Sequence, residues 1–263
     1  MKMRKSRVLE KLRKGELVSC FYMGFSESRI AELAAMHGFD CVWICMEHVA
    51  NTWSDVENLI NAAKMHDVDV MVRVARGSYS DYIKPLELDA AGIMVPHLMS
   101  VDDAKDVVRM TRFQPIGRRP LDGSNADGKF ANVDLREYIS QANEERFLCV
   151  QIEDPEPLDD LEAIAALKGV DMLFFGPWDF SHAIGAPGEW NHPKMIETRK
   201  RVAETARKYG KCAATTGDIE SLSELVDIGY QFIVLGYDAL GMNEYCNRII
   251  THFRKLCGQH GSK

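Results

Sequence analysis

The sequence lacks the features of several protein classes. It has no run of ~18 consecutive apolar residues, which is the length that a membrane-spanning helix needs. It has 32 Lys and Arg against 39 Asp and Glu, so the basic excess of a general nucleic-acid binder is missing. We find no low-complexity segment and no linker that would divide the chain. With 46% hydrophobic residues, the 263 residues suit one large α/β domain over 1–263.

Two further features bear on the compartment in which the protein works. The seven cysteines include no CxxC pair, and several, such as Cys149, lie in apolar runs. This pattern favours reduced cysteines in the cytoplasm over a disulfide framework or a zinc site. The basic segment 1–15 is not followed by the apolar stretch of a secretory signal. We predict instead a short amphipathic helix with Val8, Leu9 and Leu12 facing inward.

Short apolar runs alternate with segments of helical period along the chain. The runs show little strict alternation, which is typical of strands buried on both faces of a parallel sheet. Ser54 and Ser100 are predicted to cap the helices that follow them. The pattern predicts a single-domain (β/α)₈ TIM barrel with an N-terminal helix; a doubly wound sheet is the competitor, but its Gly-rich dinucleotide turn is absent. The predicted strands are 17–23, 40–46, 69–74, 92–96, 147–153, 171–176, 211–216 and 231–237.

In such a barrel the active site lies at the carboxyl ends of the strands. Glu153 and Asp179 follow consecutive predicted strands, so their carboxylates can meet there. Two hard oxygen donors suit Mg²⁺ or Mn²⁺. The alternative is that Asp179 only caps a short helix and Glu153 pairs with a nearby cation. Gly176 and Pro177 form a turn that would aim the backbone N–H groups of Trp178 and Asp179 at the site.

Charged side chains also end the second, third and fourth predicted strands. Arg73 ends an apolar strand, where its charge needs a partner. It forms either a structural ion pair with Glu47 or Glu153, or a clamp for a carboxylate or a developing oxyanion. His48 is either a structural residue or a general base. His97 is a minor candidate for the site.

Taken in order, these motifs resemble those of the HpcH/HpaI aldolases, metal-dependent class II enzymes of the phosphoenolpyruvate/pyruvate barrel superfamily. The resemblance extends from about residue 20 to about residue 240. The motif around Glu47 and His48 and the arginine strand match the family's own. So do the Val-Pro strand end, the Gln-x-Glu strand and the Gly-Pro-x-Asp turn. The matching stretches are AELAAMHGFDCVWICMEHVANT, MVRV, GIMVPHLMSVDDAKDVV, VQIED and GVDMLFFGPWDFS.

The resemblance implies how ligands bind. Glu153 and Asp179 would ligate Mg²⁺ or Mn²⁺, or alternatively Co²⁺. The backbone around Trp178 and Asp179 would hold the carboxylate of pyruvate, and Gln151 would lie beside the substrate.

The resemblance also implies the reaction. The enzyme would reversibly cleave a 4-hydroxy-2-oxo acid into pyruvate, or a close 2-oxo acid, and an aldehyde. Arg73 would stabilise the enolate oxygen together with the divalent metal, and His48 would be the base or part of its proton relay. The family usually has Asp three residues before this histidine, where this chain has Cys45. Oxaloacetate decarboxylation, or a non-catalytic 2-oxo-acid binder, therefore stays open.

Partners follow from the same resemblance. Family members are usually hexamers built from dimers, with the last helix packed on a neighbour, so a homo-oligomer is expected. The expected ligands are a small-molecule 2-oxo acid and an aldehyde, with no nucleic acid and no membrane. The irregular stretch 113–134 is long for a connection in a compact domain. We expect this stretch and Trp178 to shape the substrate entrance.

Overall fold

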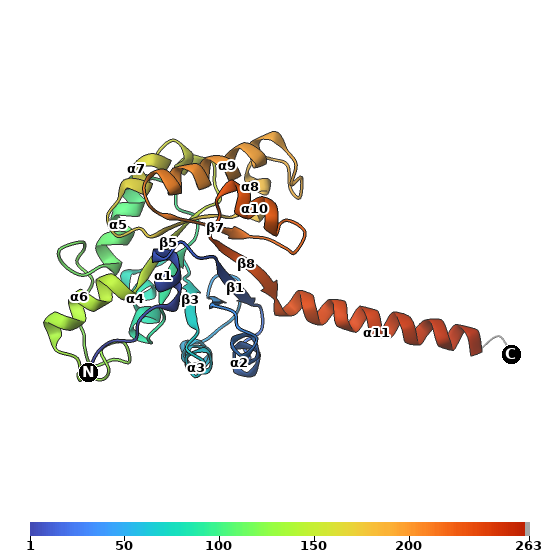
Figure 1. The fold of residues 1–263 in the computed structure, drawn as a ribbon, viewed down its shortest axis with the longest axis horizontal. Helices are drawn as coiled ribbons and strands as arrows, with labels where there is room; N and C mark the ends of the chain where they lie inside the picture. The colour runs from blue at the N-terminus through green and yellow to red at the C-terminus, as the bar shows by residue number, and fades with distance from the viewer. Residues whose placement is uncertain (261–263) are drawn as a thin grey trace.

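The computed structural model describes residues 1–260, and its eight parallel strands close into a barrel. Each strand pairs with the next, and the eighth pairs with the first (Figure 1). The predicted (β/α)₈ barrel is confirmed. A single domain over 1–263 stays a prediction, because 261–263 lie outside the described residues. The strands are β1 (Val18–Met23), β2 (Cys41–Cys45), β3 (Asp69–Arg73), β4 (Gly92–Val95), β5 (Phe147–Ile152), β6 (Met172–Phe175), β7 (Cys212–Thr216) and β8 (Phe232–Tyr237).

Helices surround the barrel and follow each strand. No helix among residues 1–260 is long and apolar enough to cross a membrane. The helices are α1 (Arg7–Arg13), α2 (Ser28–Met36), α3 (Trp53–Lys64), α4 (Tyr79–Glu87), α5 (Val101–Thr111), α6 (Leu135–Glu145), α7 (Leu161–Ala166), α8 (Pro177–Ala183), α9 (Pro193–Lys208), α10 (Leu222–Ile228) and α11 (Asp238–His260), with a 3₁₀ turn at Glu156–Leu158.

Burial on both faces explains why the strands were visible in the sequence. Every observed strand lies inside its predicted run and differs from it by at most one residue at each end. One set of side chains, including Trp43 and Phe174, fills the barrel interior. The alternate set, including Val42 and Ile44, packs against the helices. Both sets are apolar, so the strands appear as continuous apolar runs.

Helix boundaries depend on local capping. Ser100 caps α5 as predicted, and α10 ends at Gly229, whose φ of 115° suits glycine. The prediction for Ser54 is wrong, because α3 starts at Trp53 and Thr52 is its N-cap. The Thr52 side chain accepts the N–H of Asp55, and the Asp55 carboxylate accepts the N–H of Thr52. This reciprocal capping box satisfies two backbone donors, which a cap at Ser54 could not do.

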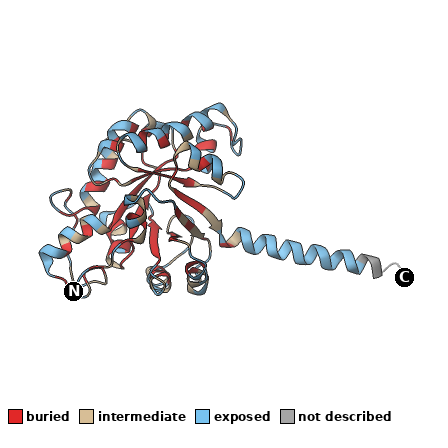
Figure 2. Ribbon diagram, in the orientation of Figure 1, coloured by how far each residue is buried: buried red, intermediate tan, exposed pale blue. Residues whose placement is uncertain are grey.

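The two terminal helices differ in how they meet the barrel. The short helix α1 packs against the barrel interior through buried Val8 and Leu9, with Leu12 partly buried, as predicted. By contrast, α11 projects away from the barrel, and its residues 240–257 are exposed (Figures 1 and 2).

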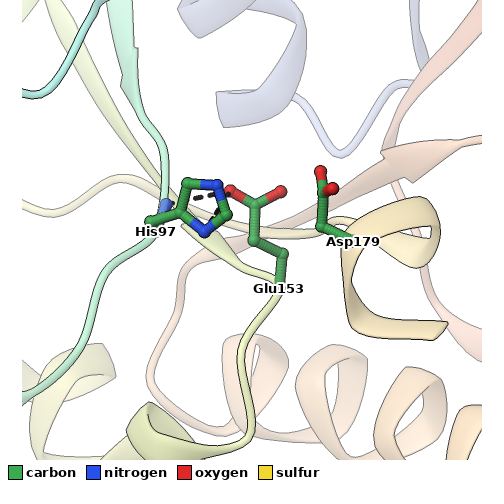
Figure 3. Close-up of side chains that lie close together, drawn as sticks. All are labelled: His97, Glu153 and Asp179. Carbon is green, nitrogen blue, oxygen red and sulfur yellow. Dashed lines mark hydrogen bonds and ion pairs between the residues drawn. The ribbon is translucent and has the colours of Figure 1, made fainter. Parts of the chain in front are cut away.

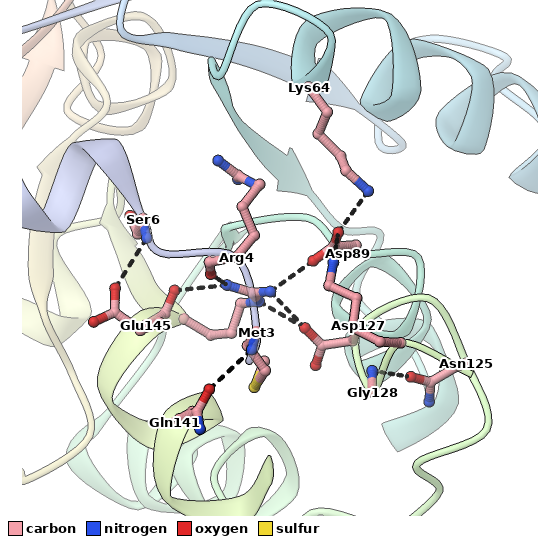
Figure 4. Close-up of polar contacts among 12 residues, drawn as sticks. Met3, Arg4, Ser6, Lys64, Asp89, Asn125, Asp127, Gly128, Gln141 and Glu145 are labelled. Atoms are coloured by element: carbon pink, nitrogen blue, oxygen red, sulfur yellow. Dashed lines mark hydrogen bonds and ion pairs between the residues drawn. The ribbon is translucent and has the colours of Figure 1, made fainter. Parts of the chain in front are cut away.

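The irregular stretch 113–134 is attached to the amino-terminal end of the barrel. Its Asp127 accepts a hydrogen bond of 2.7 Å from Nε of Arg146, the residue directly before β5. Arg146 also pairs with Asp89, shortly before β4, at 2.6 Å. Figure 4 shows Asp89 and Asp127 near one another, with Lys64 reaching Asp89. These contacts hold Asp127 at the end opposite the strand carboxyl termini of its own barrel. That the stretch shapes a substrate entrance stays a prediction.

Candidate active site

The carboxyl end of the barrel brings together the acidic residues predicted from the sequence. Glu153 directly follows β5 and is almost fully buried, and Asp179 lies half-buried in the first turn of α8. Because β5 and β6 are neighbours, the loops after them place the two side chains side by side. With His97, which follows β4, they form a group whose potential ligand atoms lie within 4.8 Å of one another (Figure 3).

A glycine leaves the space that this arrangement requires. Gln151 is buried in β5, and its side-chain amide donates a hydrogen bond to Oε2 of Glu153. A Cβ atom on Gly176 would lie 2.7 Å from Oε2 of Glu153 and 2.8 Å from the Gln151 amide nitrogen. Any larger residue would displace both groups. Oε1 of Gln151 is buried without a hydrogen-bond partner, so one acceptor remains for a ligand.

Glu153 is unusually basic for a carboxylate. Burial, together with the negative charge of Asp179, raises its pKa to about 7, although the backbone N–H of His97 and the charge of Arg73 oppose this shift. The N–H of His97 donates to Oε1 of Glu153 at 2.9 Å. Two acidic groups at close range, with incomplete compensation, are typical of a site that a cation completes.

Glu47 lies between Arg73 of β3 and His97 and contacts both side chains. The buried guanidinium of Arg73 lies over the ring of Trp43 at 4.9 Å, and its Nε is 3.1 Å from Oε2 of Glu47. The other oxygen of Glu47 is 3.7 Å from Nε2 of His97. Arg73 therefore forms the predicted ion pair with Glu47, and its charge also lowers the pKa of Glu153. Its role as a clamp for a carboxylate or an oxyanion stays a prediction.

Sequence reasoning missed the partner of His97. Nδ1 of His97 is 2.8 Å from Oδ2 of Asp154. Burial alone would lower the pKa of His97, but the hydrogen bond with Asp154 and the charges of Glu153 and Glu47 raise it. Asp154 follows directly after Glu153, and this position just beyond a strand marks it as a residue of the carboxyl end, although it does not indicate that His97 is its partner.

His48 is placed less firmly than expected for a base. Its side chain is 57% exposed, and its Nε2 lies 3.5 Å from Oε2 of Glu47. Its backbone N–H, rather than its ring, contacts Cys45, donating to the sulfur at 3.2 Å. The same sulfur accepts a hydrogen bond of 3.2 Å from the Arg73 guanidinium. Cys45 therefore links Arg73 to the backbone of His48, and the imidazole lies beside Glu47 instead.

Trp178 lies at the rim of the site. Its side chain is 67% exposed and packs edge-on against Trp190, with ring centroids 4.8 Å apart. Pro177 begins α8, so the backbone groups of Trp178 and Asp179 belong to the first helical turn. N–H groups in a first turn have no partner within the helix.

The donor set fits a divalent cation. Glu153 and Asp179 each offer a carboxylate oxygen, and His97 offers a ring nitrogen, with the three atoms within 4.8 Å of one another. Burial first, and then the charge of Asp179, raise the pKa of Glu153, so both disfavour its ionised form. A cation would favour that form.

Known proteins resemble this chain over nearly its whole length. A 2-keto-3-deoxy-L-rhamnonate aldolase of Escherichia coli is 30% identical over 261 residues, covering 97% of this chain and 94% of its own. The crystal structure of an HpcH/HpaI aldolase from Desulfitobacterium hafniense superposes with a TM-score of 0.88 at 27% identity, covering 93% and 95% of the two chains. A citrate synthase structure superposes with a TM-score of 0.86 at 25% identity, covering 95% and 98%.

The family model described as HpcH/HpaI aldolase/citrate lyase matches residues 18–243, from the first strand into α11. The resemblance drawn from the motifs and the predicted class, a carbon–carbon lyase, are both confirmed. This chain belongs to the HpcH/HpaI aldolase/citrate lyase family.

Proposed function

We propose that this enzyme reversibly cleaves a 4-hydroxy-2-oxo acid into pyruvate, or a close 2-oxo acid, and an aldehyde, and that it requires a divalent metal. The observation that carries the proposal is the approach of Glu153 and Asp179 in reach of the buried charge of Arg73. Such cleavage leaves negative charge on the keto oxygen of the 2-oxo acid. Positive charge fixed at that position lowers the barrier.

Glu153 and Asp179 are the proposed metal ligands, for Mg²⁺ or Mn²⁺, or alternatively Co²⁺. A divalent cation held there supplies Lewis-acid stabilisation of the developing negative charge. Gln151 orients Glu153 by donating a hydrogen bond to it, and the glycine at 176 keeps the space open.

The remaining residues bind and orient the substrate. Arg73 adds a second positive charge, held in place by Glu47, Cys45 and the face of Trp43. The backbone N–H groups of Trp178 and Asp179 bind the carboxylate of the 2-oxo acid, because the first turn of α8 leaves them without partners. The free Oε1 of Gln151 accepts a hydrogen bond from the substrate.

His48 is the proposed base or part of its proton relay. Its exposed ring lies at the rim, where the aldehyde half leaves, and can exchange protons with solvent. Glu47, 3.5 Å from the ring, is its nearest carboxylate and supports it in place of the aspartate that Cys45 replaces.

A retro-aldol assay tests the function. The protein is incubated with 4-hydroxy-2-oxo acids, including 2-keto-3-deoxy-L-rhamnonate, and pyruvate is measured with Mg²⁺, Mn²⁺ or Co²⁺ and after chelation. Pyruvate should appear only with metal. Deuterium exchange at C3 of pyruvate, followed by NMR, should show the same dependence. Turnover that survives full chelation would overturn the metal role.

Cys45 favours a second candidate, oxaloacetate decarboxylation. Decarboxylation needs the same stabilised negative charge but no proton transfer to an aldehyde oxygen, so it tolerates the missing aspartate partner of His48. Oxaloacetate turnover without retro-aldol activity across a panel of substrates would select it. Retro-aldol turnover at comparable rates would reject it.

We propose a homo-oligomer, a hexamer built from dimers as in the family, and the exposed helix α11 supports association between chains. It carries a stripe of exposed apolar side chains at helical spacing: Met242, Tyr245, Ile249, Phe253 and Leu256. Such a stripe is typical of a helix that packs on another chain. Light scattering with size-exclusion chromatography should show an assembly in the wild type and smaller species for Ile249→Glu. We also propose a cytoplasmic location, because all seven cysteines are free thiols and five are buried.

A further inference from the structure

We propose that His97 is a third protein ligand of the metal, so that the site presents one nitrogen and two carboxylates. The site would then bind Co²⁺ or Zn²⁺ more tightly than Mg²⁺, and loss of the His97 side chain would reduce this difference in affinity. The inference rests on the metal site of the proposed function and adds to it a ligand and a metal preference.

The position of His97 is built into the backbone. Its φ is 46°, in the left-handed region that few non-glycine residues occupy. In this conformation its own N–H bonds to Oε1 of Glu153 at 2.9 Å, and Nδ1 of its ring lies 3.8 Å from the same oxygen. One residue thus fixes a ligand of the metal and presents a second donor beside it. Uncommon backbone conformations of this kind gather at functional sites.

The ring is also oriented as in histidines that bind metals. Such residues usually donate their other ring N–H to a carboxylate, which fixes the tautomer. Asp154 has this place, with Oδ2 at 2.8 Å from Nδ1. In the neutral ring, Nε2 is then the nitrogen that carries the lone pair. Its neighbour is Oε1 of Glu47 at 3.7 Å, beyond hydrogen-bond distance, so no hydrogen bond ties up that lone pair.

His48 provides the contrast within the same rim. It follows β2, which β3 separates from β4 in the barrel, its ring is more exposed than that of His97, and no hydrogen bond orients that ring. It does not belong to the group of ligand atoms within 4.8 Å, which comprises only His97, Glu153 and Asp179 among the residues described. Lying near the site is therefore not enough to make a histidine a metal ligand. The two histidines differ in their carboxylate partners, since Asp154 lies 2.8 Å from the His97 ring and Glu47 lies 3.5 Å from the His48 ring.

The donor set determines the metal preference. Mg²⁺ favours oxygen ligands in an all-oxygen octahedron, whereas imidazole suits the later first-row metals. Replacing a water ligand by imidazole should strengthen Co²⁺ and Zn²⁺ binding much more than Mg²⁺ binding. Loss of the imidazole should therefore act selectively on the later metals.

Pulsed electron paramagnetic resonance of the Mn²⁺-loaded protein tests the ligand directly. We expect nuclear modulation from a coordinated ¹⁴N in the wild type, its retention in His48→Gln and its loss in His97→Asn. Asn is chosen because it tolerates left-handed backbone. The absence of ¹⁴N coupling in the wild type, which requires no variant to fold, would overturn the proposal. So would coupling that persists in His97→Asn.

Calorimetric titration with Co²⁺ and with Mg²⁺ measures the preference. His97→Asn should raise the Kd for Co²⁺ by about tenfold or more and change the Kd for Mg²⁺ much less. Asp154→Asn should raise the Kd for Co²⁺ by about tenfold, as is usual when the group behind a metal-binding histidine is lost. Parallel loss for both metals, or no loss for either, contradicts the proposal.

These measurements do not depend on turnover. Nitrogen ligation in a protein without lyase activity would reject the proposed function and leave this inference standing. Lyase activity that falls in His97→Asn, with ¹⁴N coupling and Co²⁺ affinity unchanged, would make His97 a proton-transfer group and refute its role as a ligand.

Discussion

At the amino-terminal end of the barrel the buried carboxylate of Asp89 lies between cations, whereas at the carboxyl end the buried carboxylate of Glu153 lies beside another acid. Burial would raise the pKa of Asp89, but Arg146 and Lys64 hold it below its ordinary value. Burial and Asp179 instead raise the pKa of Glu153 to about 7. The amino-terminal end is thus complete within the chain, and the carboxyl end is complete only with a ligand.

The largest expected effect comes from removing the carboxylate at the carboxyl end. Glu153→Gln should lower retro-aldol activity by about 10³-fold or more, equivalent to ~4 kcal/mol, because a metal ligand is lost. The same change should stabilise the metal-free protein at pH 8. The raised pKa means that the folded protein binds this proton more tightly than the unfolded chain does, so ionisation destabilises the fold.

The pH window follows from the same pKa. The penalty begins as the pH rises above the ordinary carboxyl value of 4.5 and is fully present above about 7. Denaturation of the metal-free proteins should show Glu153→Gln more stable by on the order of 2 kcal/mol at pH 8 and equal to wild type at pH 4. If Glu153→Gln and the wild type were equally stable at both pH values, ionisation of Glu153 would not destabilise the folded protein.

Breaking the amino-terminal end should have the next largest effect, and on stability alone. Arg146→Ala leaves Asp89 and Asp127 buried without their shared guanidinium. The loss should be about 3–5 kcal/mol in the free energy of unfolding, measured with denaturant. Lys105→Ala, which removes only an exposed pair with Asp102, is the control and should show no resolvable change.

Activity separates the two ends further. Because Arg146 lies at the opposite end of the barrel, the folded fraction of Arg146→Ala should keep its turnover and metal affinity. Loss of turnover in fully folded protein would mean that the two ends of the barrel are coupled. The amino-terminal end would then not be purely structural.

A smaller effect is expected on metal binding as a function of pH. The metal must displace the proton of Glu153, whose pKa is about 7 in the metal-free protein. The apparent affinity should therefore fall by about tenfold per pH unit below 7 and level off above it. Calorimetry at pH 6 in two buffers of different ionisation enthalpy should show proton release. Binding that is independent of pH from 6 to 8 would place the pKa of Glu153 well below 7.

The acids of the carboxyl end could be predicted because barrel geometry relates them simply to the sequence. Arg73, Gln151, Glu153 and Asp179 each lie in the last residues of a strand or just beyond it, and such positions converge. The pairing of His97 with Asp154 could not be predicted, because it depends on a left-handed backbone after β4 that no residue type dictates.

The amino-terminal end was hidden from sequence reasoning for a different reason. Asp127 lies in an irregular stretch, and its partner Arg146 is distant from Asp89 in the chain. Only the closed barrel brings these residues together, because strand starts converge as strand ends do. The length of 113–134 indicated that this stretch is more than a connection, but it did not indicate at which end of the barrel the stretch is attached.

The smallest expected effect concerns Cys45, which replaces the family's usual aspartate and contacts both Arg73 and His48. Its sulfur already receives N–H groups from both residues. Cys45→Asp should place a carboxylate that accepts the same two donors and adds charge near the His48 ring. We expect retro-aldol activity to rise by about fivefold, ~1 kcal/mol, with oxaloacetate turnover little changed.

Cys45→Ser separates charge from hydrogen bonding, since a hydroxyl accepts both donors without being ionised. It should leave the ratio of retro-aldol to decarboxylation rates near that of the wild type. If serine raised the ratio as much as aspartate, the shape of the acceptor rather than its charge would control His48. If aspartate lowered both rates, it would be drawing Arg73 away from the substrate, and the thiol would be the group that keeps this guanidinium available to the carboxyl end.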